Sequence, residues 1–172
     1  EHARFNRLRV GVYAMIGIGL GGLLLAMLSR QWGWDGTLTA MGWFFTKAAL
    51  VTFGGAYAVL PYVYQGGVEQ YGWLTATQMI DGLALGETTP GPLIMVVAFV
   101  GFVGGWSKEV FGPDALLLAG MAGAGIATFY TFLPSFLFIL IGGPLVEATR
   151  GDIKFTAPLT GITAAVVGVV IN

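Results

Sequence analysis

The chain has 172 residues, of which 56% are hydrophobic and only 10% are charged. Soluble domains carry about 25% charged residues, so this composition excludes an ordinary soluble domain and indicates a membrane-embedded protein. The net charge of −1, from 8 basic and 9 acidic residues, excludes a polybasic surface for nucleic acid. With no cysteine and one histidine, His2, the sequence also excludes thiolate metal sites, cysteine nucleophiles and histidine-based catalysis in the core.

Residues 10–28 form the first predicted membrane span. They are almost all apolar, and 19 residues are enough to cross about 30 Å of hydrocarbon and too many for the core of a signal peptide. Gly17 and Gly21 lie four residues apart, which predicts close packing of another helix. The excess of basic residues on the cytoplasmic side of membrane proteins predicts a cytoplasmic N-terminus. The basic residues before the span are Arg4, Arg7 and Arg9.

The second apolar segment, residues 38–64, is interrupted by Gly54 and Gly55 and further on by Pro61. Adjacent glycines predict either an unwound point, where the backbone can approach a ligand, or ordinary close helix packing. Lys47 also lies inside this segment. Its ammonium could neutralise a bound anion, pair with a carboxylate, or reach back to the membrane surface.

Two short helices are predicted on either side of a proline–glycine break. Residues 65–72 are polar and predict a loop outside the membrane, after which Thr75 is the predicted N-cap of an amphipathic helix. The break covers residues 86–92 and the second helix covers residues 93–106. Each helix has about 14 residues, or about 21 Å, and is too short to cross the hydrocarbon alone. The pattern predicts a re-entrant hairpin. The apolar face of its first helix is predicted to contain Ala76, Met79, Ile80, Leu83 and Ala84.

The distribution of lysine and arginine bears on this hairpin. If residues 75–106 return to the side they came from, the basic residues divide four inside to three outside, whereas one net crossing divides them five to two. The count therefore favours one net crossing by a broken, bent passage. Residues 115–143 then predict a long span kinked near Pro134, and a loop follows at 147–154. The last apolar run, 156–172, is at the low edge for a span, so we expect a piece of a longer protein or an unusually short membrane protein.

The break at residues 86–92 is the most specific candidate for chemistry. A helix that starts at Pro90, Gly91 and Pro92 within the membrane presents unpaired N–H groups and a positive dipole end, both of which attract an oxyanion. Thr88 and Thr89 add hydroxyl donors beside it. The alternative is an ordinary proline–glycine loop at the surface.

Two acidic residues, Asp81 and Glu87, flank the same break. Ionisable groups at membrane depth are costly and commonly serve as proton or ion sites. The alternative is that Asp81 lies at the interface and is solvated. For Glu87, which adjoins the break, the functional interpretation is favoured.

Several motifs together resemble one family, the chromate ion transporters, over about residues 43–172. They are FGG followed by AYAVLP at 53–61, GWLT at 72–75, DGLALG at 81–86, TPGP at 89–92 and FLPSF at 132–136. The sequence is similar to the second half of long members, which contain two homologous halves. Residues 1–36 would then be the connection between the halves and its first span. Residues 37–172 would be a single half-repeat, truncated at its C-terminus.

The resemblance and the spans predict an all-α polytopic membrane protein with about five transmembrane passages, including discontinuous helices around the FGG and TPGP breaks. It implies export of chromate, with sulfate as a similar dianion, across a bacterial-type inner membrane. The expected partners are the oxyanion, membrane lipid, and a homologous N-terminal half or a second copy; no enzyme activity, cofactor, metal or nucleic acid is predicted. The predicted substrate-binding residues are Lys47, Gly54, Gly55, Thr88, Thr89 and Gly91. The predicted coupling residues are Asp81 and Glu87, and the predicted structural motif residues are Phe53, Pro61, Trp73, Pro90 and Pro92.

Other classes of protein compete with this interpretation. A non-transporting membrane subunit or assembly fragment would also need glycine-rich packing faces. An intramembrane aspartyl protease would need two aspartates on facing spans, and Asp81 alone lies near membrane depth in the predicted arrangement. We therefore rank the protease last.

Overall fold

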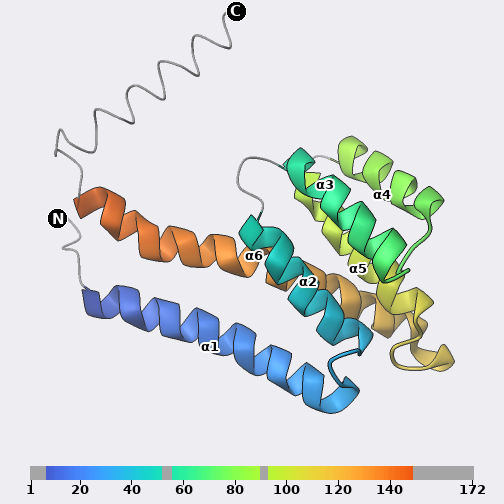
Figure 1. The fold of residues 1–172 in the computed structure, drawn as a ribbon, viewed down its shortest axis with the longest axis horizontal. Coiled ribbons are helices and arrows are strands. Elements are labelled where there is room, and N and C mark those ends of the chain that lie inside the picture. Colours follow the sequence, from blue (N-terminus) through green and yellow to red (C-terminus); the bar gives the residue numbers. More distant parts are fainter. Residues whose placement is uncertain (1–6, 52–55, 90–92, 149–172) are drawn as a thin grey trace, which may run out of the picture. The chain divides into compact units, whose positions relative to one another are not determined.

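The computed structural model describes residues 7–51, 56–89 and 93–148, and these residues form helices and short connections without any strand. The all-α polytopic membrane class predicted from the sequence is thus confirmed (Figure 1). The α-helices are α1 (Arg7–Trp32), α2 (Thr37–Val51), α3 (Ala56–Tyr64), α4 (Ala76–Thr88), α5 (Val96–Ser107) and α6 (Leu116–Ala148). The shorter elements are the π-helix η1 (Gln65–Gln70) and the 3-10 turns η2 (Leu93–Met95) and η3 (Pro113–Ala115).

Two helices within the described ranges are long and apolar enough to cross a membrane. They contain the candidate spans Val10–Trp32, with 23 residues, and Pro113–Gly143, with 31 residues. The other α-helices have 9 to 15 residues, short of the roughly 20 that a single crossing needs. The number of five passages therefore stays a prediction.

The chain divides into two compact units. The larger contains residues 17–136, and the smaller contains residues 1–16 together with 137–172. The described part of the smaller unit exposes apolar side chains, as expected of a surface in contact with lipid. These include Met15, Ile16, Phe138 and Ile139.

The larger unit contains two helical hairpins. Phe44 of α2 stacks on Tyr62 of α3, with ring centroids 4.8 Å apart, so the chain reverses direction between these helices. A Cβ added at Gly82 of α4 would lie 2.5 Å from Phe99 of α5, so these helices also run antiparallel. Figure 1 shows both hairpins with their tips at the same end. The hairpin predicted for residues 75–106 is formed by α4 and α5, which pack against each other, and the single net crossing favoured by counting basic residues stays a prediction.

The core of the larger unit is an aromatic cluster at the end opposite the hairpin tips. Trp73 stacks on Tyr71 at 4.6 Å and meets Phe44 edge-on at 5.5 Å. The rings of Phe45 and Trp73 are also stacked, with centroids 6.1 Å apart. Offset and edge-on aromatic pairs are the favoured geometries. The cluster connects α2 to the segment between α3 and α4, so it anchors the open ends of both hairpins.

Glycines let α5 and α6 approach to backbone contact. A Cβ added at Gly123 of α6 would collide with the carbonyl oxygen of Gly101 and lie 3.3 Å from Gly105 Cα. Gly101 and Gly105 are four residues apart, which is the small-residue spacing that membrane helices use for close packing. Part of the glycine excess in the composition is explained by this contact.

The structure corrects three local predictions. The predicted loop at 65–72 is largely the π-helix η1, in which Gly66 and Gly67 are buried, because Gly66 lies against the Phe44 ring. The buried side of α4 contains Met79 and Gly82, while Ile80 is 65% exposed, since α4 packs on α5 through Gly82. Helix α6 continues through Pro134 to Ala148, so residues 147 and 148 of the loop predicted at 147–154 are helical.

The N-cap predicted at Thr75 is confirmed. Its hydroxyl oxygen accepts a hydrogen bond from the Gln78 backbone N–H at 3.2 Å, and its own N–H donates to the Gln78 side chain at 2.8 Å. This reciprocal pair is a capping box, which satisfies two N–H groups at the helix start.

Candidate functional site

The site predicted from the sequence is centred on two breaks, and the residues that flank them come together in the structure. The breaks themselves lie outside the described residues, and so do the predicted residues Phe53, Gly54, Gly55, Pro90, Gly91 and Pro92. Helix α3 begins directly after the first break and η2 begins directly after the second. These two elements pack against each other. The chain therefore starts two helical segments from neighbouring positions at the hairpin tips.

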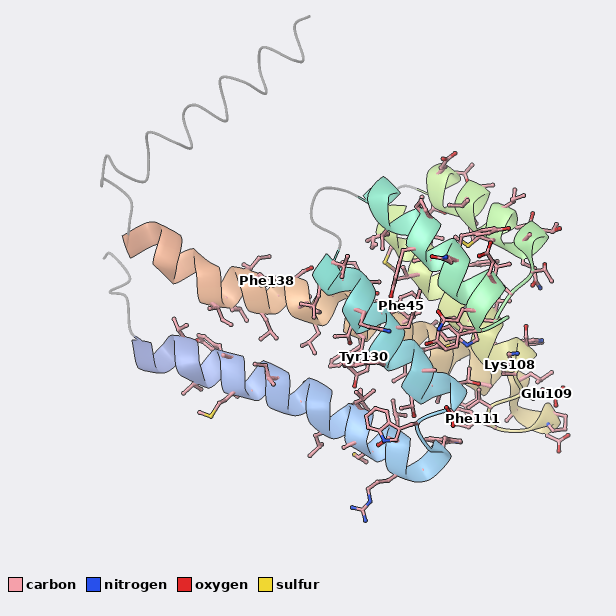
Figure 2. All side chains as sticks on the ribbon, viewed as in Figure 1. Phe45, Lys108, Glu109, Phe111, Tyr130 and Phe138 are labelled. Atoms are coloured by element: carbon pink, nitrogen blue, oxygen red, sulfur yellow. The ribbon has the colours of Figure 1, made fainter. Side chains whose placement is uncertain are left out.

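Helices α2 and α4 are the first arms of the two hairpins in the larger unit. Their lengths determine how far the hairpin tips lie from the charged end of that unit. Helix α2 has 15 residues and α4 has 13, or about 22 Å and 20 Å at 1.5 Å per residue. Both start at the end where Figure 2 shows Lys108 and Glu109. Other charged residues lie in the last turn of α1, in the connection after it, in η1 and in η3; they are Arg30, Asp35, Glu69 and Asp114.

Lys47 lies on α2, four residues before the helix ends. Its side chain is half-buried, and its Nζ atom is 5.7 Å from the centroid of the Trp43 ring. A cation over an indole face is attracted by the ring quadrupole, which holds the ammonium without neutralising its charge. The i, i+4 spacing of Trp43 and Lys47 could have revealed this pair in the sequence.

Thr88 and Thr89 lie at the end of α4, and their hydroxyl groups are already used. The Thr88 hydroxyl donates to the Ala84 carbonyl oxygen at 2.9 Å, and the Thr89 hydroxyl donates to the Leu85 carbonyl oxygen at 2.7 Å. Both side chains are exposed. To serve as the donors predicted for an anion, the two hydroxyls must rotate away from these carbonyls.

Asp81 and Glu87 lie on α4, and both are exposed. Neither forms an ion pair with Lys47 among the described residues. The sequence left open whether Lys47 pairs with one of these carboxylates, and within this chain it does not. Helix α4 therefore carries two carboxylates on a surface that the described part of the chain leaves uncovered.

The two described structural-motif residues have different surroundings. Trp73 is buried in the aromatic cluster, where it also lies against Gly104 of α5. Pro61 lies inside α3 and is exposed. Sequence reasoning did not find Phe44, whose ring contacts Tyr62, Tyr71 and Trp73. No sequence signal distinguishes it from the neighbouring Phe45.

Taken together, the two long apolar helices and the two hairpins of short helices define a class, the polytopic helical membrane proteins. Helix ends within the membrane are typical of ion and substrate sites in transporters. The chromate transporter family matches residues 39–172, and the chain belongs to this family.

The chain covers only about a third of the length of several longer relatives. A chromate transport protein of Cupriavidus metallidurans is 34% identical over 133 residues, which cover 77% of this chain and 30% of that protein. A chromate transport protein of Pseudomonas aeruginosa is 40% identical over 72% of this chain and 26% of its own length. An uncharacterized transporter of Methanocaldococcus jannaschii is 28% identical over 92% of this chain and 35% of its own length. No solved structure matches the chain.

Proposed function

We propose that this chain forms the oxyanion-binding part of a membrane transporter that exports chromate, with sulfate as a chemically similar substrate. The observation that carries the proposal is the packing of α3 against η2, the two helical segments that follow the breaks. Each first turn presents N–H groups without helical partners and a positive dipole end. Two such ends facing one ligand suit a tetrahedral dianion.

The lengths of the hairpin arms support a site near the membrane midplane. Both arms start beside the charged connections, and about 20 Å of helix brings the tips past the headgroup region to roughly the middle of 30 Å of hydrocarbon. A backbone site at this depth avoids burying many charges, which agrees with a chain that has only 10% charged residues.

Lys47 supplies the one cation that we assign to the anion. It lies near the tip end of α2 and is held by an aromatic ring instead of a carboxylate, so its charge stays available. Glu87, at the tip end of α4, and Asp81 are the coupling residues. A nearby carboxylate opposes a dianion while it is charged and stops opposing it once protonated. Proton uptake at Glu87 would thus favour anion binding.

The proposal extends to the whole transporter. Residues 37–172 act as one half-repeat, residues 1–36 as the connection and first span, and a homologous half or a second copy completes the protein. The chain lies in the inner membrane with its N-terminus in the cytoplasm. The two halves rock about the central site to alternate access. No bond is made or broken in the substrate, so the protein is not an enzyme.

Chromate flux into vesicles tests the function. The chain is reconstituted in lipid vesicles, and labelled chromate or sulfate is offered with a pH gradient that is imposed and then collapsed. Gly91→Leu should abolish flux, because the side chain obstructs the first turn after the break. Gly125→Leu is the matched control, since a Cβ at Gly125 meets nothing within 4 Å. Equal flux in the Gly91→Leu variant and the unmodified chain would overturn the site.

A binding measurement separates a transporter from a non-transporting subunit. Chromate or sulfate should raise the melting temperature of the purified chain if the site exists, because a ligand that binds only the folded state stabilises it. No shift with either anion, in a chain that unfolds cooperatively, contradicts the proposed site.

A further inference from the structure

The exposed side of α2 combines a charge with large apolar side chains. Trp43, Lys47 and Leu50 follow the i, i+4, i+7 spacing of one helix face, and Val51 adjoins them. Val51 is 76% exposed, and Trp43 and Leu50 are about half exposed. Helix α2 buries its opposite side, with Phe44, Phe45 and Ala48, against the unit. A lysine on an outward face at membrane depth is costly in lipid.

The exposed side of α4 has the opposite charge. Ile80, Ala84 and Glu87 follow the same i, i+4, i+7 spacing, and all three are exposed. No described residue supplies a cation to Glu87. The chain therefore presents two helix faces of the same pattern, one with a lysine and one with a glutamate, and neither charge is neutralised within the unit.

The two charges also lie at the same depth. Lys47 is ten residues after the start of α2 and Glu87 is eleven residues after the start of α4, which is about 15 Å and about 16 Å along the two arms. Both helices start at the charged end of the unit. Each charge thus lies inside the hydrocarbon at nearly the same level, between the charged end of the unit and the hairpin tips. A second copy inserted in the same orientation would present its own charges at this level.

We infer that the α2 face of one copy of this chain docks on the α4 face of a second copy, with Lys47 paired to Glu87 of that second copy. Two faces of opposite charge on one chain allow a twofold interface, in which the same contact forms twice. The apolar residues Trp43 and Leu50 on one side and Ile80 on the other would surround each ion pair and exclude lipid. The inference rests on the proposed function in one respect, because it names the partner that completes the site.

The pair also explains how an anion could be exchanged. With the site empty, Glu87 of the second copy neutralises Lys47. A dianion that reaches Lys47 competes with this carboxylate for the ammonium. The same contact therefore serves as the interface and as the place where the anion enters.

Crosslinking between two tagged copies tests the interface directly. The chain has no cysteine, so single cysteines give no background. Copies with Lys47→Cys are expressed with differently tagged copies with Glu87→Cys in lipid membranes and treated with a short bismaleimide. We expect a product of doubled mass that carries both tags, at least fivefold more abundant than with Asp81→Cys, the matched acidic and exposed position on α4. A yield as high with Asp81→Cys, or a dominant product between two Lys47→Cys copies, overturns the inference.

A charge exchange provides the second measurement. Lys47→Glu alone and Glu87→Lys alone should each lower the dimer fraction several-fold, and the double variant should restore it. Two controls apply to the cysteine variants: they should elute like the unmodified chain, and they should react fully with a monofunctional maleimide. If variants that pass both controls give no crosslink, the interface is wrong. Chromate flux plays no part in either readout. Crosslinking without chromate flux would therefore contradict the proposed function alone. Chromate flux without crosslinking would contradict this interface alone.

Discussion

The hydroxyl of Tyr130 on α6 donates a buried hydrogen bond of 2.7 Å to the backbone carbonyl oxygen of Gly21 on α1. The two residues are 109 positions apart in the sequence, and the same tyrosine ring lies against Gly42 of α2. One side chain thus connects three helices. The absence of a side chain at Gly42 makes room for the ring, because a Cβ there would lie 2.9 Å from it.

Removing this hydroxyl should lower stability without disturbing packing. Tyr130→Phe keeps the ring and loses the hydrogen bond, which should cost about 1 kcal/mol of unfolding free energy. Thermal unfolding in detergent or lipid measures the loss. Tyr64→Phe is the control, because Tyr64 is an exposed residue at the end of α3. An equal loss in both variants would show that the Gly21 bond contributes nothing specific.

Adding one methyl group to α6 should have opposite results at two nearby glycines. Gly123→Ala should destabilise the chain by about 1–3 kcal/mol, since its Cβ collides with the Gly101 backbone, which cannot rotate away. Gly125→Ala should be neutral or stabilising, because the space there is open and alanine favours the helix. Melting temperatures compare the two variants. Similar values would contradict the close contact between α5 and α6.

Loss of the Lys47 charge should lower the chromate flux. Lys47→Gln should reduce chromate flux about tenfold, the effect of losing about 1.4 kcal/mol in a charge-assisted contact. Lys108→Gln, at the exposed end of α5, should leave flux unchanged. Equal flux in the Lys47→Gln variant and the unmodified chain, in vesicles with equal protein content, would remove Lys47 from the site.

The capping box at the start of α4 offers a prediction independent of function. Thr75→Ala removes the acceptor for the Gln78 N–H and should cost about 1 kcal/mol. Thr77→Ala, two residues later on the exposed side of the same helix, is the control. Hydrogen exchange of the first turn of α4 should rise in the first variant and not in the second. Unchanged exchange in Thr75→Ala would mean that the cap does not hold this turn.

Local signals in the sequence were reliable where a short stretch decides the outcome. The span at residues 10–28 lies within α1, because an uninterrupted apolar run has few alternatives in a bilayer. Thr75 with Gln78 three residues later specified the start of α4 through its own hydrogen bonds. The loop predicted at 65–72 failed because burial of Gly66 against Phe44 depends on a partner more than twenty residues away.

By itself, then, the composition determined a helical membrane protein, and the glycine and proline motifs predicted where two of its helical segments are interrupted. Only the tertiary structure decided that the segments on either side of each break fold back as hairpins and that α3 meets η2. It also decided that Lys47 rests on Trp43 while Asp81 and Glu87 lie on another helix. The physical reason is that a glycine or proline motif allows the chain to change direction but does not determine the new direction. That direction is determined by packing between distant residues, such as Phe44 on Tyr62 and Gly82 on Phe99.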